Sequence, residues 1–382
     1  MKKKVFKQLI VAMAAMVCIS ACVTDKPEPT PEVVPTVWKV LWAICPEIDA
    51  EINGKRYQTS MTAEEIEIVK SKAAWFEEFV EQNADGWVDI QITTDVIRNT
   101  ITAIEHNEET AWGFRLPLAD RIRLCPEDNF DCFIYTADYT GIPINWRAIT
   151  SWNTSWMVFC HTGGWVWEYG GFNPDATTKQ YHRNVYVHEW CHQLEAFFPS
   201  LGEGYEMPVL HDDQSAYAYT EANTGLTGET RSEKWYADYI HGTIVAYPGA
   251  TASCKGVHPD WWQYTPLSFR EDIITMPYNY ETGVEAPPTV MVKWKKPVEQ
   301  SWSTGSFHVV LRDGETDVEL GFYNVTNLMS ADRMTLTIDF SQPLYRMWDN
   351  VYETINFVSG KSYRLTSYSL GYADFSITFT IK

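Results

Sequence analysis

The pattern of apolar residues changes at Pro287-Pro288, and this change sets how the chain can fold. After it, short runs alternate apolar and polar residues at every second position, as in Met334–Phe340 and Phe375–Ile381. Such alternation is typical of strands that bury one face. Roughly seven runs of this kind follow one another, which is the spacing of a small antiparallel sandwich. We therefore expect residues 288–382 to form an all-β, sandwich-like domain.

The preceding part, residues 37–287, mixes helix and strand patterns. Thr62 and Glu65 have the spacing of a capping box, so a helix is expected from there to about Gln82. The fold class predicted for the chain is therefore α+β followed by all-β. Further expected elements are a hairpin at Asn53-Gly54, a short helix over Val96–His106, buried strands at Phe133–Thr136 and Trp156–Cys160, and a helix around Trp235–Ile240.

The first residues have the features of an export signal. Four lysines precede an apolar run over Leu9–Ile19, which is shorter than a membrane span. The run ends in Ile19-Ser20-Ala21-Cys22, which resembles the bacterial lipobox. This resemblance implies a signal peptide over residues 1–21 and a lipid anchor on Cys22. Residues 22–36 are rich in proline and are expected to form an extended tether.

The charge of the chain limits its partners. The formal net charge is −20, and removing residues 1–21 takes away four lysines, which gives 26 − 50 = −24. Nucleic-acid binding is not expected, because phosphate contacts need clustered Lys and Arg. We expect an exported bacterial lipoprotein that contacts the membrane through Cys22. Val23 follows the anchor in place of the aspartate linked to inner-membrane retention, which favours the outer membrane.

Export permits disulfide bonds between the cysteines of the mature chain. Besides Cys22 there are six, and six cysteines allow 15 pairings. Cys125 and Cys132 flank an acidic loop and are the favoured local pair. No two cysteines have the CxxC spacing, so a structural zinc site built on cysteines is not expected.

One motif indicates chemistry. Residues 185–194 contain His188-Glu189-x-x-His192 within an apolar segment. On a helix, two residues four apart share one face and lie about 6 Å apart along the axis, so both imidazoles can bind one zinc ion. Glu189 projects about 100° away, where it can act as a general base toward a water on the zinc. The alternative is a helix with two incidental core histidines. In that case an unpaired, buried Glu189 between them would cost free energy.

The longer segment resembles the zincin metallopeptidases. Val185 is aliphatic, Tyr186, Trp190, Cys191 and Gln193 are uncharged, and Leu194 is apolar, while the strands expected at 133–136 and 156–160 precede the helix as in that family. The resemblance implies a zincin-like catalytic domain over residues 37–287. It also implies zinc as cofactor, peptide or protein substrates, and Glu189 as the catalytic base. The position six residues after His192 is Phe198, so the chain is not a standard metzincin.

A catalytic zinc needs a third protein ligand and an open position. His211 is the favoured candidate, because 19 residues leave room for a turn at Gly202 or Gly204 and a return. Its alternative is a surface histidine beside two aspartates. Glu195 is close to the helix face of His188 but lies almost one turn beyond His192. We therefore expect it to orient a ligating histidine rather than to bind zinc itself. The remaining candidate ligands are Glu203, Asp212, Asp238 and His241.

Other polar residues near the motif have candidate roles. Tyr217 or Tyr219 could stabilise an oxyanion, although aromatic packing is the commoner role for either. Asp212 could orient an imidazole or could be solvated. The resulting hypothesis is a lipid-anchored, zinc-dependent metallopeptidase whose C-terminal domain is an accessory module. The alternative is a lipoprotein that binds glycans or proteins and retains an inactive zincin-like fold.

Overall fold

A computed structural model of the chain describes residues 34–106, 111–114, 116–138, 142, 156–161, 184–298, 306–367 and 373–382. The chain divides into Met1–Val34 and Pro35–Lys382, and the elements below all belong to the second unit. The architecture is a mixture of helices and sheets, so the α+β prediction is confirmed at this level. The signal peptide and Cys22 lie outside the described residues. Among the described helices, none has the length and apolarity needed to cross a membrane.

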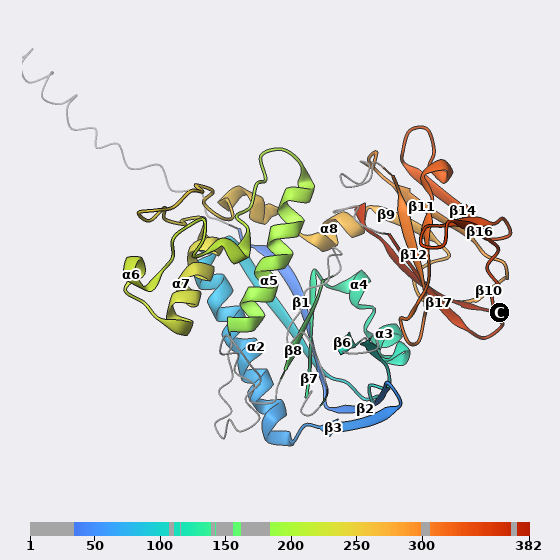
Figure 1. Cartoon of the computed structure of the whole chain (residues 1–382), viewed down its shortest axis with the longest axis horizontal. Coiled ribbons are helices and arrows are strands. Elements are labelled where there is room, and N and C mark those ends of the chain that lie inside the picture. The colour runs from blue at the N-terminus through green and yellow to red at the C-terminus, as the bar shows by residue number, and fades with distance from the viewer. Residues whose placement is uncertain are drawn as a thin grey trace, which may run out of the picture. The chain divides into compact units, whose positions relative to one another are not determined.

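A four-stranded parallel sheet lies at the centre of the first part (Figure 1). Strand β1 has β4 on one side and β7 on the other, and β8 pairs with the outer edge of β7. Every residue from Val40 to Cys45 is buried, as expected for a strand covered on both faces. The strands are β1 (Thr36–Cys45), β4 (Val88–Val96), β7 (Cys132–Ala137) and β8 (Trp156–His161).

Two long helices pack on one face of this sheet, and a third packs against both of them. They are α2 (Ala63–Asn83), α5 (Asn184–Phe197) and α7 (Gly228–His241). Helix α2 begins with the expected capping box between Thr62 and Glu65. The even-numbered residues of β1, such as Trp38 and Trp42, share one core with the buried sides of these helices. Short helices complete the region: α3 (Leu118–Leu124), α4 (Pro126–Asn129), α6 (Glu221–Thr224), α8 (Pro266–Arg270), and the 3-10 turns η1 (Phe198–Leu201), η2 (Leu210–Asp212) and η3 (Pro259–Gln263).

The other face of the sheet is covered by two hairpins. The odd-numbered residues of β1 pack there in a second core. The predicted turn at Asn53-Gly54 is confirmed, since both residues have a positive φ and join paired strands. The predicted helix over 96–106 is wrong. The Ile97 and Ile101 amides donate to the carbonyls of Ile44 and Glu47 instead of to their own segment. The hairpin strands are β2 (Glu47–Ile52), β3 (Lys55–Ser60), β5 (Ile104–His106) and β6 (Ala111–Phe114).

Two further sheets enclose a separate core in the C-terminal part. One has seven strands in the order β10-β18-β17-β12-β13-β15-β16, and the other has the order β14-β11-β9. Strands β9 and β10 precede Pro287-Pro288 but pair with strands that follow it. The strands are β9 (Ile273–Met276), β10 (Glu281–Val284), β11 (Thr289–Trp294), β12 (His308–Asp313), β13 (Glu319–Asn324), β14 (Thr335–Asp339), β15 (Leu344–Arg346), β16 (Val351–Glu353), β17 (Ser362–Ser367) and β18 (Ser376–Ile381), with the turn η4 (Thr326–Leu328).

A buried ionic cluster joins the C-terminal sheets to helix α4. The Arg364 guanidinium lies 3.0 Å from Asp317 and 3.5 Å from Glu127, and all three side chains are buried. The Tyr280 hydroxyl donates to the second oxygen of Glu127 at 2.7 Å. Burial lowers the pKa of Arg364, but Asp317 and Glu127 more than offset this effect, and the net pKa is raised. The Arg364 guanidinium therefore keeps its positive charge in contact with the two carboxyl groups.

The predicted disulfide between Cys125 and Cys132 is wrong, because both thiols are free. Cys132 lies in β7 with its side chain in the core beneath the helices. Cys125 ends helix α3 in a left-handed conformation, and its thiol donates to the Ile122 carbonyl at 3.0 Å. The two side chains therefore belong to different environments despite their closeness in sequence.

Candidate metal centre

Helix α5 presents His188 and His192 on one face because its other positions are held in the core. Tyr186, Trp190 and Leu194 are fully buried. The Trp190 ring forms a triangle with Trp38, at 5.7 Å, and Trp262, at 6.0 Å between ring centroids. These bulky contacts fix the rotation of the helix about its axis.

A polar contact fixes the helix along its length. Gln193 donates to the Asp131 carbonyl at 2.8 Å. The Asp131 carboxylate in turn accepts from the backbone amides of Lys39 in β1 and Leu267 in α8, at 2.8 and 2.7 Å. Asp131 thus connects α5 to the central sheet and to α8. The two histidines therefore project from a rigid support.

His211 joins this pair from the turn η2. Its Nε2 lies 3.0 Å from Nε2 of His192, and its ring centroid is 5.1 Å from that of His188. One ring nitrogen from each of the three histidines lies within 4.8 Å of the other two. Nitrogens that share a tetrahedral zinc ion are about 3.3 Å apart, given Zn–N bonds of about 2.0–2.1 Å. The His192 and His211 nitrogens, 3.0 Å apart, are close to this spacing, and with His188 they form a candidate donor set for such an ion.

Glu195 ties two of these histidines together. One carboxylate oxygen lies 2.7 Å from Nδ1 of His192, and the other accepts from the Leu210 amide at 3.2 Å. A carboxylate only accepts hydrogen bonds, so Nδ1 of His192 is the donor in this contact, and Nε2 is the atom that would bind a metal ion. The second bond holds the residue next to His211. A carboxylate behind a ligating imidazole is the usual support of zinc histidines.

Tyr236 on helix α7 supports His188 in a similar position. Its hydroxyl lies 2.9 Å from Nδ1 of His188, and the residue is buried. The pKa of Tyr236 is raised, first by burial and then by nearby groups that include Glu189, so the hydroxyl stays protonated. The sequence predicts a helix around Trp235–Ile240 but no contact between Tyr236 and a histidine. No local pattern could indicate the contact, because it depends on how α7 packs against α5.

The electrostatic surroundings favour the neutral form of His188 and of His211. Burial lowers the pKa of His188 to about 3, with smaller contributions from His192 and His211. Burial also lowers the pKa of His211, as does His192, whereas Glu195, Asp213 and Asp212 raise it. Neutral imidazoles are the form that binds metal ions. The donor set thus matches the requirements of a borderline cation such as zinc.

Glu189 lies on the same helix directly after His188. Its side chain is 6% exposed, and its charge raises the pKa of Tyr236. A carboxylate this deeply buried is rare unless it is compensated or has a functional role. Its carboxylate lies close enough to Tyr236, the partner of His188, to influence the pKa of that hydroxyl.

The structure does not bring the other predicted polar residues to the histidines. The Tyr219 hydroxyl donates to Asp238 at 2.8 Å and accepts from the Val245 amide. Tyr217 packs against Trp235 at 5.2 Å, and burial raises its pKa to about 12. Asp212 accepts from Ser215 at 2.9 Å within its own turn. The residue that contacts and orients an imidazole, that of His192, is Glu195 and not Asp212.

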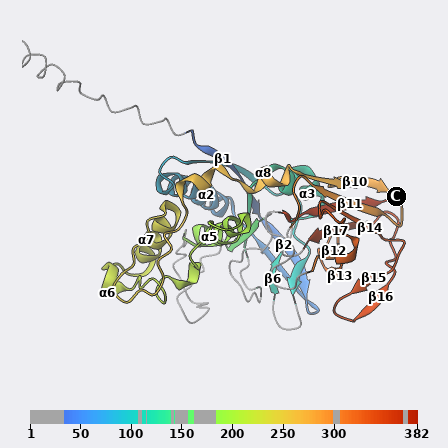
Figure 2. The same cartoon turned by 90° about the horizontal axis from the view of Figure 1, so that it is seen from above.

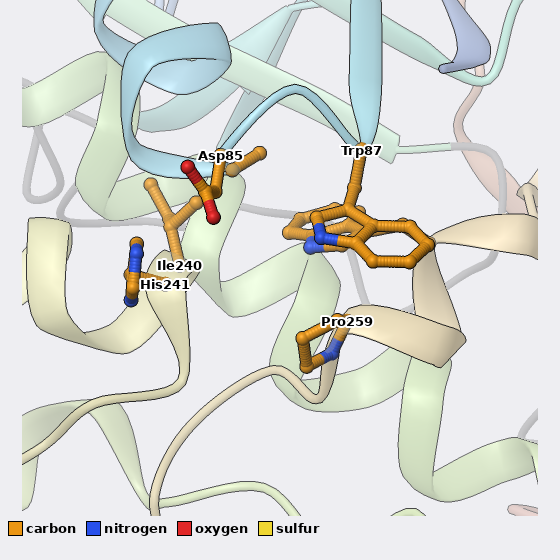
Figure 3. Close-up of a pocket in the computed structure, with 7 residues that line it drawn as sticks. Asp85, Trp87, Ile240, His241 and Pro259 are labelled. Atoms are coloured by element: carbon orange, nitrogen blue, oxygen red, sulfur yellow. The ribbon is translucent and has the colours of Figure 1, made fainter. Parts of the chain in front are cut away.

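A small cavity beside α7 contains one of the alternative ligands, His241. Figure 3 shows His241 and Asp85 on one side of it and Trp87 on the other, with Pro259 below. Its volume is about 30 Å³, which is the space of roughly one water molecule. The histidine cluster does not line it, so this cavity is separate from the candidate metal centre.

Comparisons with protein-family models, with curated proteins and with solved structures find no match to this chain. The case for a function therefore depends on the geometry of the histidine cluster and on the motif that supplies it.

Proposed function

We propose that the chain is a zinc-dependent metallopeptidase with a zincin-like catalytic domain. The convergence of His188, His192 and His211 beside the buried Glu189 is the observation that carries this proposal. Three imidazoles and a glutamate in the HExxH spacing are the groups that zinc hydrolases use. The support of His192 by Glu195, at 2.7 Å, is in keeping with the same chemistry.

Each group of residues in the site would have a separate role. His188, His192 and His211 would hold the ion, while Glu195 and Tyr236 keep two of the rings in orientation. A bound zinc supplies Lewis acidity, which polarises a carbonyl and lowers the pKa of water. Glu189 takes the proton of the attacking water and delivers it to the leaving amine. Its burial excludes bulk water, which strengthens its interaction with that proton.

The decisive variant is Glu189→Gln, which keeps the shape of the side chain but cannot accept the proton. We expect zinc content to stay at one ion per chain by elemental analysis. Hydrolysis of a mixed fluorogenic peptide library should fall by about 10²–10⁴-fold, the usual contribution of a general base. His211→Ala is the matched comparison and should lose both zinc and activity. Wild-type protein without zinc, or full activity in Glu189→Gln, would contradict the proposal.

We further propose that the enzyme is exported and anchored by lipid at Cys22. The supporting observations are the apolar run and the Ile19-Ser20-Ala21-Cys22 segment. Radioactive palmitate should label the full chain in a bacterial host and should not label Cys22→Ser. Equal labelling of both proteins would exclude an anchor at this residue.

A further inference from the structure

The seven-stranded sheet carries an ordered group of aromatic rings on the face opposite its core. Val309, Leu311 and Tyr323 point into the core. The register pairs His308 with Asn324 and Val310 with Phe322, so His308 and Phe322 lie together on the other face. Tyr345 pairs with Asn324, and Tyr352 pairs with Tyr345, which places both tyrosines on this face as well.

The rings of His308, Phe322 and Trp348 form a stack whose last ring is exposed to solvent. His308 and Phe322 have ring centroids 5.1 Å apart at an angle of 22°, and Phe322 and Trp348 are 5.2 Å apart at 20°. The exposed fraction rises along the stack from 2% for His308 to 7% for Phe322 and 69% for Trp348. The indole is therefore the outermost layer. One of its faces covers Phe322, and its other face is presented to solvent.

Hydrogen bonds hold the exposed rings in place. The Trp348 indole nitrogen donates to Glu319 at 3.2 Å. The Tyr345 hydroxyl donates to Asn350 at 2.8 Å, and its ring lies 5.3 Å from that of Tyr352, which is 73% exposed. Tyr345, Trp348 and Tyr352 belong to the hairpin β15–β16, which Figure 2 shows at the outer edge of the sheet. We call Trp348, Tyr345 and Tyr352, with Glu319 and Asn350, the aromatic platform.

We propose that the aromatic platform binds a neutral glycan, an activity that goes beyond the proposed hydrolysis. A sugar ring has an apolar face of C–H groups and an edge of hydroxyls. The face fits the negative face of a flat indole, and the hydroxyls fit carboxylate and amide groups beside it. The platform offers both at once, in positions fixed before binding, which reduces the entropy lost on association.

The local charge selects the class of ligand. Glu319 and Asp349 lie at the platform, and its only nearby cation, among the described contacts, is Arg346, which already pairs with Asp349 at 2.9 Å and Glu353 at 3.1 Å. The chain as a whole has a net charge of −20. Acidic glycans, nucleic acids and anionic membranes are therefore repelled. A protein partner is less favoured, because binding hot spots are enclosed by a rim that excludes water, whereas Trp348 lies open at an edge.

The test measures binding of the full chain, purified in detergent, to a printed array that holds neutral glycans, acidic glycans and unglycosylated proteins. We expect binding to a subset of neutral glycans. Trp348→Ala should weaken the affinity for the best of these at least tenfold, and Tyr352→Ala about threefold or more. Trp348→Phe should retain part of the affinity. Because these side chains are exposed, the thermal unfolding midpoint should not change.

Two controls separate this site from the rest of the molecule. Tyr278→Ala removes an aromatic side chain that is 65% exposed but lies outside the platform, and it should bind as the wild type does. Glu189→Gln should also bind normally, so that loss of hydrolysis and loss of binding are distinguishable. Binding to no neutral glycan, binding only to acidic glycans or to proteins, or equal affinity of Trp348→Ala and wild type would overturn the proposal.

Discussion

The histidine cluster and the ionic cluster around Arg364 both bury titratable groups, but they treat them in opposite ways. At the ionic cluster, the Arg364 guanidinium lies against two carboxyl groups, and Arg312 lies 3.9 Å from one of them, Asp317. At the histidine cluster, burial lowers the pKa of His188 to about 3, and three imidazoles direct nitrogens toward a common point. Burial of polar groups alone therefore does not identify a site. The distinguishing feature is convergence of neutral donors, with their supporting partners placed behind them.

The largest loss of stability is expected for a variant of the ionic cluster. Arg364→Met would remove the buried cation that contacts both Asp317 and Glu127 and leave Arg312 beside Asp317 alone, which costs about 3–5 kcal/mol of unfolding free energy. Urea unfolding would measure this loss. Zinc content and peptide hydrolysis of the folded variant should match those of the wild type. Among the residues that the structure describes, no group of the ionic cluster contacts the three histidines.

Arg56→Met is the matched control for this variant. Arg56 pairs with Asp49, but its side chain is 65% exposed. Solvent screens such a pair, so the unfolding free energy should barely change. Equal destabilisation by the two arginine variants would show that burial does not distinguish the two pairs. Loss of zinc in folded Arg364→Met would show that the two clusters are coupled.

The sequence could predict those parts of the site that depend on local geometry. The spacing of His188 and His192 and the apolar positions between them are sufficient to predict a helix that presents both rings. The capping box of α2 and the hairpin at Asn53-Gly54 were likewise correct, because each depends on residues within a single turn. His211 could be proposed only from the length of the intervening loop.

The incorrect predictions involved contacts between distant segments. The residues after Val96 were predicted as a helix, but their amides pair with the ends of β1 and β2, which local pattern does not report. Cys125 and Cys132 were close in sequence, but the strand β7 turns one of them into the core. Tyr236 was missed because it lies 48 residues from His188 and meets it only through helix packing.

A smaller effect is expected at the support of the histidine cluster. Glu195→Gln keeps the size of the side chain but offers only one accepting oxygen, so it cannot serve both His192 and the Leu210 amide. Loss of such a supporting carboxylate typically weakens zinc binding about 10–100-fold. Competition with a chromophoric chelator would measure this. Glu203→Gln, which alters an exposed glutamate eight residues later, should bind zinc normally. The reverse ranking would make Glu203 the better candidate for a metal role.

The smallest effect is expected for Tyr236→Phe, which removes one hydroxyl and leaves the ring in its packing site. The lost hydrogen bond to His188 should cost about 1 kcal/mol, or roughly fivefold in zinc affinity. With zinc in excess, peptide hydrolysis should return close to the wild-type rate, because a residue that only orients His188 has no further part in the reaction. Tyr219→Phe alters a hydroxyl that Asp238 engages, so it should leave zinc affinity unchanged. If Tyr236→Phe instead keeps its zinc affinity and loses turnover at saturating zinc, the hydroxyl acts on the substrate. Tyr236 would then take the oxyanion-stabilising role that the sequence assigned to Tyr217 or Tyr219.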